Sequence, residues 1–331
     1  MINQRQKDLL KYIVEDYIKT AHPIGSKSLC EKLDCSSATI RNEMSYLEEI
    51  GLLEKTHTSS GRIPSEKGYR FYVDNIMKPK ELTGEDVLKL QTIFRNNSLM
   101  LSDTILRSME IISELTSYTA IVLGKSSKDN KVSKIEVVPL DENNFIAIIV
   151  TDKGHVEHKK MYLNEKINLN EIKSVVEIIN KHIVGTPIDE VNQKLEYEVK
   201  PIIGDEIKQK EVLYNAFYNV FTDLRKANVK VNNASHMLKE PEFNEADKIR
   251  KILEKFEDKD IVQGIEENDD GTGVHIYIGS ENNFDDDVTI IKTKYSVDGE
   301  EGTIALVGPK RMEYDRATTL LNYIIENIER R

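Results

Sequence analysis

Long polar side chains lie between residues 36 and 50 with the spacing of one face of a helix. Two of them can form paired hydrogen bonds with the edge of a base, Arg41 with guanine and Asn42 with adenine. Small uncharged residues surround them, which would let such a helix approach a DNA major groove closely. The residues that we expect to contact bases are Thr39, Arg41, Asn42 and Tyr46. Taken alone, the segment leaves an ordinary amphipathic surface helix as the alternative.

Apolar residues in the same segment predict how that polar face is held outward. Ile40, Met44, Leu47 and Ile50 recur at intervals of three and four residues, which indicates one buried helix face. Gly51 is typical of a residue that ends a helix. Upstream, apolar pairs over residues 3–20 predict a first helix, and Ser26 is expected to cap a short second one. The three helices together predict a helix-turn-helix.

The residues after this helix predict a strand, a polar loop and a return strand. Residues 52–55 are strand-like, and the loop 56–62 contains no carboxylate and is expected to have Gly61 and Arg62 at its tip. Hydroxyl groups and an arginine in that position suit contacts to phosphates or the minor groove. The residues that we expect to contact the DNA backbone or minor groove are Ser36, Ser37, Lys55, His57, Thr58, Ser59 and Arg62. Ser65 is expected to cap the next helix, so residues 1–77 are predicted to form a winged helix-turn-helix domain. A winged helix that binds protein remains an alternative.

The distribution of charge restricts where DNA could bind. Residues 1–75 carry 11 Lys and Arg and 11 Asp and Glu, whereas the rest of the chain carries 35 and 46, so the net charge of −11 lies entirely outside the first 75 residues. An acidic body repels DNA. Only the N-terminal segment is therefore expected to approach DNA, through a local basic surface.

The sequence contains no complete catalytic or metal-binding pattern. His155, Glu157 and His158 form the only histidine cluster, but they do not share one face of a strand. The chain has no Walker phosphate loop or nucleophile elbow, and its two cysteines do not have zinc spacing. We therefore expect neither an enzyme nor a cofactor or metal site. The sequence has no signal peptide or membrane-length apolar run, which predicts a cytoplasmic protein.

The rest of the chain mixes helices and strands. Helices are predicted over 86–94 and 102–118, and an antiparallel meander over 120–123, 134–139, 145–151 and 156–162. Helices follow near 170–182, 188–195 and 208–226, and further strands are predicted over 274–278, 288–295 and 303–307 before a last helix. Strands on both sides of a helical block indicate one α+β domain with an insertion. At its C-terminal corner we expect Arg311 to form a structural ion pair; an anion or effector site there is the alternative.

Two segments resemble a known family. The run SATIRNEMSYLEEIGLLEKTHTSSGRIPSEKGYRFYVD and the later GPKRM, followed by Tyr314, are similar to the heat-inducible transcription repressor HrcA of bacteria. The resemblance implies an α+β multidomain protein: a winged helix-turn-helix (1–77), a GAF-like domain (78–164 plus 245–331) and an inserted helical dimerising domain (165–244).

The resemblance also implies a function. A homodimer would repress transcription from an inverted-repeat operator upstream of chaperone genes, and its activity would be tuned by the GroEL chaperonin, which heat diverts to other clients. A metabolite-sensing regulator that uses the GAF-like domain as its ligand pocket is the alternative. An adaptor that binds protein through the winged helix is a third reading.

Overall fold

The computed structural model describes residues 2–56, 61–96, 99, 101–124, 131–152, 156–162, 169–203, 214–222, 229–266, 271–297 and 300–330. The chain forms two compact units. The first contains Met1–Val122, Val231–Val297 and Thr303–Arg331, and the second contains Leu123–Lys230 and Asp298–Gly302. Within these ranges no helix has both the length and the apolar character needed to cross a lipid bilayer.

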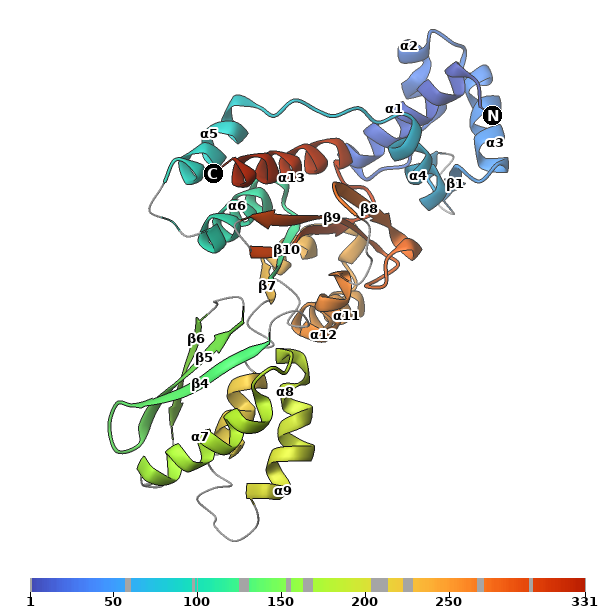
Figure 1. The fold of residues 1–331 in the computed structure, drawn as a ribbon. Coiled ribbons are helices and arrows are strands. Elements are labelled where there is room, and N and C mark those ends of the chain that lie inside the picture. Colours follow the sequence, from blue (N-terminus) through green and yellow to red (C-terminus); the bar gives the residue numbers. More distant parts are fainter. Residues whose placement is uncertain are drawn as a thin grey trace. The chain divides into compact units, whose positions relative to one another are not determined.

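The first unit begins with the predicted winged helix-turn-helix (Figure 1). Its elements are α1 (Gln4–Thr20), the 3₁₀ turn Ser26–Leu29, α2 (Cys30–Leu33), α3 (Ser37–Glu49), β1 (Leu53–Lys55), β2 (Arg62–Pro64) and α4 (Glu66–Asn75). The sequence-based boundaries are confirmed at several caps: Ser36 caps α3, Ser65 caps α4, and Gly51 follows α3 with a positive φ of 79°. Ser26 is not a cap; it is the first residue of the 3₁₀ turn.

The body of the first unit is a five-stranded sheet in the order β7-β3-β10-β9-β8. Its strands are β3 (Thr119–Gly124), β7 (Val229–Asn232), β8 (Val274–Ile278), β9 (Val288–Val297) and β10 (Glu300–Pro309). The helices of this body are α5 (Gly84–Phe94), α6 (Leu101–Thr116), α11 (Ala246–Glu257), α12 (Lys259–Gln263) and α13 (Tyr314–Glu329). Ala120 and Leu306 pack into the core that α6 and α13 share with the winged helix. On β9, Lys292 contacts Ile265 in the 3₁₀ turn Gly264–Glu266, which follows α12.

The second unit has a separate core. A three-stranded meander of β4 (Val132–Pro139), β5 (Asn144–Thr151) and β6 (Val156–Tyr162) packs with α7 (Leu169–Ile183). The helix α8 (Ile188–Lys194) continues through a π-helical turn, Leu195–Val199, into α9 (Lys200–Ile203), and residues 214–222 are also helical. On β5 the buried residues alternate, with Phe145, Ala147 and Ile149 inside.

This arrangement corrects two sequence-based expectations. Residues 120–123 do not belong to the meander, because β3 pairs in the five-stranded sheet. The main segment of the second unit is Leu123–Lys230, which differs from the insertion predicted at 165–244. The reason is that β4–β6 bury their inner face against α7 and not against the large sheet. The GAF-like character of the first unit's body stays a prediction.

Arg311 confirms the structural ion pair expected at the C-terminal corner. Its guanidinium forms ion pairs with Glu240 and Glu242, and its Nη1 donates to the carbonyl of Ile18 at 3.0 Å. The side chain is 12% exposed, which leaves little room for a separate anion. This corner therefore joins the last turns of α1 to the body of the first unit.

Candidate nucleic-acid interface

The N-terminal end of α3 is fixed by hydroxyl groups. Ser36 Oγ accepts from the Thr39 backbone N–H at 3.2 Å and lies 2.9 Å from Thr39 Oγ1. Ser37 Oγ lies 2.8 Å from Ser26 Oγ in the preceding helical turn. These contacts hold the first turn of α3 against the rest of the helix-turn-helix. Its free amides and partial positive charge are suited to a phosphate.

The outward face of α3 carries the side chains that the sequence analysis selected. Ile40, Met44 and Leu47 are buried, and Arg41, Asn42 and Ser45 are exposed. Tyr46 is 40% exposed, whereas Thr39 is half-buried beside Ser36. The predicted base-contacting residues therefore lie on one helix, and three of them, Arg41, Asn42 and Tyr46, are exposed.

Two of the carboxylates of α3 are neutralised by neighbours. Glu43 forms an ion pair with Arg5 at 2.8 Å and accepts from Gln6 Nε2 at 2.7 Å. Glu48 forms an ion pair with Arg62 at 2.7 Å. Each pair offsets a negative charge that would otherwise repel a phosphate backbone.

The position of Arg62 differs from the expectation. It lies on β2 opposite Lys55, and not at a loop tip. Its backbone also forms two hydrogen bonds of 2.9 Å with Ile24, which adds a bridge to the β1–β2 pair. The side chain is 14% exposed and donates to Glu48 through Nε at 2.8 Å. The three loop residues His57, Thr58 and Ser59 lie outside the described residues.

A groove of about 240 Å³ separates α3 from the β1–β2 pair. Its walls include three cationic side chains, Arg41, Lys55 and Arg62, together with Ser45 of α3. Ser26, which the sequence analysis did not select as a contact, also lines the groove and accepts from Arg41 Nε at 3.2 Å. Only the folded helix-turn-helix brings it there, so no local pattern indicated it. The geometry gives a phosphate-sized basic groove beside the exposed face of α3.

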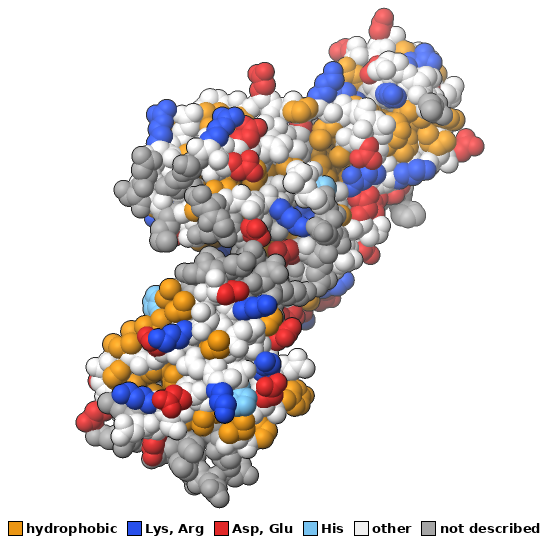
Figure 2. Space-filling model, viewed as in Figure 1, with side chains coloured by type: hydrophobic (Ala, Val, Ile, Leu, Met, Phe, Trp, Pro, Cys, Tyr) orange, Lys and Arg blue, Asp and Glu red, His pale blue; other side chains and the backbone are white. Residues whose placement is uncertain are grey.

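One face of the molecule carries mixed charge. In the face drawn in Figure 2, Lys and Arg side chains are interspersed with Asp and Glu over the described residues of both units. No large basic patch is visible on that face.

Comparisons with known proteins agree with this geometry. Residues 1–75 match the family described as "Winged helix-turn-helix transcription repressor, HrcA DNA-binding", and residues 102–318 match "HrcA protein C terminal domain". Proteins named heat-inducible transcription repressor HrcA from Bacillus pumilus and from Lysinibacillus sphaericus are each 38% identical to the chain. The first comparison covers 99% of this chain and 97% of the relative, and the second 98% and 96%.

The fold also has a solved relative. The crystal structure of a hypothetical protein at 2.2 Å resolution matches with a TM-score of 0.63 and 24% identity, covering 100% of this chain and 98% of the other. That likeness concerns the fold alone. The two family matches and the near full-length relatives concern the sequence itself. The chain therefore belongs to the HrcA family of heat-inducible transcription repressors, and its first 75 residues form the DNA-binding winged helix of that family.

Proposed function

We propose that the chain represses transcription by placing α3 in the major groove of an operator. Thr39, Arg41, Asn42 and Tyr46 would contact bases. Ser36, Ser37, Lys55, His57, Thr58, Ser59 and Arg62 would contact the backbone or minor groove. The observation that carries the proposal is the exposed face of α3 beside a groove with three cationic side chains. Base contacts would give sequence preference, and the groove would give affinity that depends on salt.

The proposed operator is an inverted repeat upstream of chaperone genes, bound by a homodimer. A two-fold symmetric protein presents two copies of α3 and requires a site with the same symmetry. The second unit offers a surface for pairing. Opposite its buried face, β5 carries the half-buried Ile146, Ile148 and Val150, and the neighbouring Val156 on β6 is exposed.

We further propose that the GroEL chaperonin tunes this activity. The support for this part is the family resemblance: the repressor would need the chaperonin to reach its active fold, and heat would divert the chaperonin to other clients.

The test is a gel-shift titration of the region upstream of the chain's own gene, with the purified full-length protein. The proposal predicts one shifted complex that contains two protomers. This complex should be lost when five base pairs are inserted between the half-sites, because half a helical turn rotates one half-site to the other side of the DNA. Adding GroEL should raise the fraction of active protein after heating. Equal binding to spaced and native sites would contradict the dimeric mode, and indifference to GroEL at every temperature would contradict the chaperonin part.

A further inference from the structure

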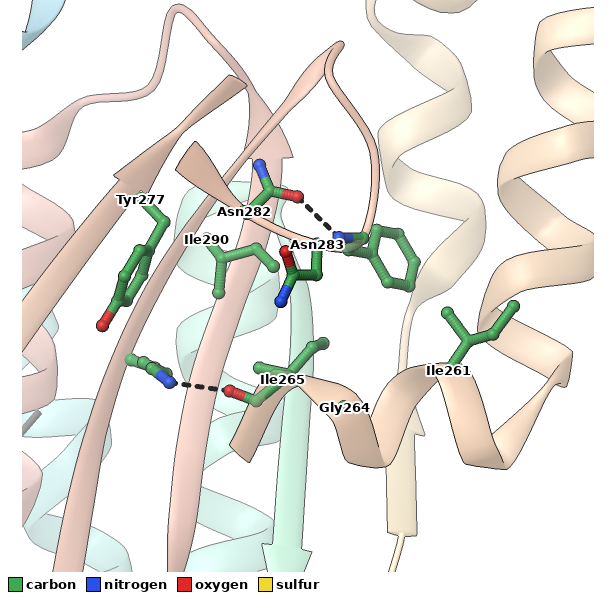
Figure 3. A pocket seen from close by; sticks show the side chains of 9 residues that line it. Ile261, Gly264, Ile265, Tyr277, Asn282, Asn283 and Ile290 are labelled. Atoms are coloured by element: carbon green, nitrogen blue, oxygen red, sulfur yellow. Dashed lines mark hydrogen bonds between the residues drawn. The ribbon is translucent and has the colours of Figure 1, made fainter. Parts of the chain in front are cut away.

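The body of the first unit contains a cavity of about 160 Å³ between β8, β9 and the turn that follows α12 (Figure 3). Its volume is roughly five times the share that one water occupies in the liquid. Lys292, Tyr277 and Asn283 supply its polar groups, and Ile265 and Ile290 are among its apolar walls. We propose that this cavity binds a small carboxylate with an apolar body, and that its occupancy is coupled to the DNA-binding winged helix.

Lys292 gives the cavity its charge preference. The residue is 4% exposed, although lysine is almost never buried so completely in proteins. Its Nζ donates to the carbonyl oxygen of Ile265 at 2.7 Å and lies 4.9 Å from the centre of the Tyr277 ring. Both contacts orient the ammonium group at the cavity wall. At such a partly buried wall, an anion interacts with a cation more strongly than it does in water.

The remaining walls limit the ligand to one with a compact apolar part. Ile261, Ile265, Ile290 and Phe284 present hydrocarbon to the cavity. Figure 3 shows the Asn283 side chain pointing into the space beside Ile265 and Ile290. Its amide can donate to one carboxylate oxygen while Lys292 contacts the other. A short branched or ring-containing monocarboxylate combines these features, whereas a sugar or a nucleotide would leave polar groups against the isoleucines.

One segment joins this cavity to the DNA-binding domain. It is residues 279–285, and Asn282 holds it together by accepting from the backbone N–H groups of Phe284 and Asp285, each at 2.9 Å. On one side, Lys255 of α11 donates to Asp285 at 2.7 Å. Because Asn283 and Phe284 line the cavity, the position of this segment must respond to what fills it.

The other side of the same segment holds α4 of the winged helix. The Ser280 backbone N–H donates to Glu66 at 3.0 Å, and Arg70 Nε donates to Glu281 at 2.9 Å. Gly279 has a φ of +54°, and a Cβ there would lie 2.2 Å from Glu66 Oε2, so the contact requires glycine. Burial would raise the pKa of Glu281, but hydrogen bonds from Arg70 and from the Ile278 backbone N–H outweigh it and lower that pKa. The ion pair therefore persists at neutral pH and can transmit a shift of the segment to α4.

The first experiment measures ligand binding without DNA, on the full-length chain. Isovalerate and benzoate are the probes, with isovaleramide and benzamide as uncharged controls, observed by saturation-transfer NMR and calorimetry. We expect dissociation constants of about 1 mM or tighter for the carboxylates and at least about tenfold weaker binding of the amides.

Three variants locate the site. Lys292→Met should weaken carboxylate binding by at least about tenfold, which corresponds to about 1.4 kcal/mol. Lys294→Met removes the same charge from an exposed position on β9 and should leave binding unchanged. Asn283 is exposed, so Asn283→Asp should fold normally and weaken binding through charge repulsion. Carboxylates that do not bind, or that bind Lys292→Met and Asn283→Asp as well as the natural chain, would overturn the proposal.

The second experiment tests the coupling, which rests on the proposed function. Isovalerate or benzoate should change the operator affinity of the natural chain in a gel shift, and Glu281→Gln should bind the probe equally but lose that change. A probe that binds with no effect on the operator affinity would overturn the coupling. If the probe binds and no DNA is bound under any condition, the proposed function fails while the carboxylate site stands. If DNA is bound and no probe is bound, the carboxylate site fails while the proposed function stands.

Discussion

Replacing Glu48 by Gln should strengthen DNA binding through Arg62. In the free protein, Glu48 accepts from Nε of Arg62 at 2.8 Å and from a terminal guanidinium nitrogen at 2.7 Å, so it competes with any phosphate for that cation. Each additional phosphate contact steepens the dependence of log K on log salt by about 0.9. Arg62 makes only part of a contact in the natural chain, so freeing it adds at most one. Between 200 and 50 mM salt, the affinity therefore rises by up to roughly 3.5-fold beyond the change seen with the natural chain.

The stability of the domain should change little in that variant. The Arg62 side chain is 14% exposed and that of Glu48 is 35% exposed, so solvent screens the pair. Partly exposed pairs of this kind contribute about 1 kcal/mol or less. A melting curve recorded beside the DNA titration would show whether the variant folds as the natural chain does.

Two controls isolate the role of Arg62. Glu49→Gln removes the same charge from an exposed position on α3 and should raise affinity only slightly, without a steeper salt dependence. The double variant with Glu48→Gln and Arg62→Ala should lose the gain, because the freed cation is absent. The assay is fluorescence anisotropy with labelled operator and scrambled duplexes at four salt concentrations. A fall in affinity for Glu48→Gln, or a gain that persists without Arg62, would refute the role that we assign to this pair.

Two further predictions concern the stability of the first unit. Gly68→Ala should destabilise it by roughly 1–3 kcal/mol in urea denaturation, because the new Cβ would lie 2.0 Å from the carbonyl oxygen of Leu52. Gly84→Ala is the control: its new Cβ meets no atom within 4 Å, so its stability should stay within about 1 kcal/mol of that of the natural chain. Asp86→Asn should cost about 1–2 kcal/mol near neutral pH. Burial opposes ionisation of Asp86, but hydrogen bonds from Thr83 and Arg316 lower its pKa below the usual value. The stabilising effect of the carboxylate is therefore present above pH about 4 and is lost as the pH falls through the folded-state pKa. Melting curves of both chains should therefore converge once the pH falls below the folded-state pKa of Asp86. A difference that stays constant to low pH would contradict the ionic role.

Local patterns predicted the winged helix well because the start, the end and the buried face of each helix depend on residues that are close in the sequence. Ile40, Met44 and Leu47 define the buried face of α3, Gly51 ends the helix and Ser65 starts the next one. Caps and helical periodicity depend on neighbouring residues. The exposed positions of Arg41 and Asn42 follow directly from the same periodicity.

Pairings between distant residues were not predictable in the same way. The strand over 120–123 was assigned to the wrong sheet, because an apolar run does not reveal which strand it pairs with. On β5 the buried residues are Phe145, Ala147, Ile149 and Thr151. The intervening Ile146, Ile148 and Val150 are apolar too, so the sequence shows no alternation. Nothing near Arg62 in the sequence indicates that its partner is Glu48, 14 residues earlier. Lys292 could have been noticed as a cation that directly follows the apolar run Ile290–Ile291 in its strand.

The central claim is that α3 reads bases while the groove beside it binds the backbone. The most direct test is a competition gel shift in which Asn42→Ala and Arg62→Ala are titrated against the inverted repeat and a scrambled duplex over a range of salt. Asn42→Ala should lose about 1–3 kcal/mol of preference for the repeat and keep its salt dependence. Arg62→Ala should bind both duplexes more weakly by similar factors and lower the salt slope by less than about 1, because Glu48 competes for Arg62 in the natural chain. If Asn42→Ala keeps the full preference of the natural chain for the inverted repeat, α3 does not read bases as proposed.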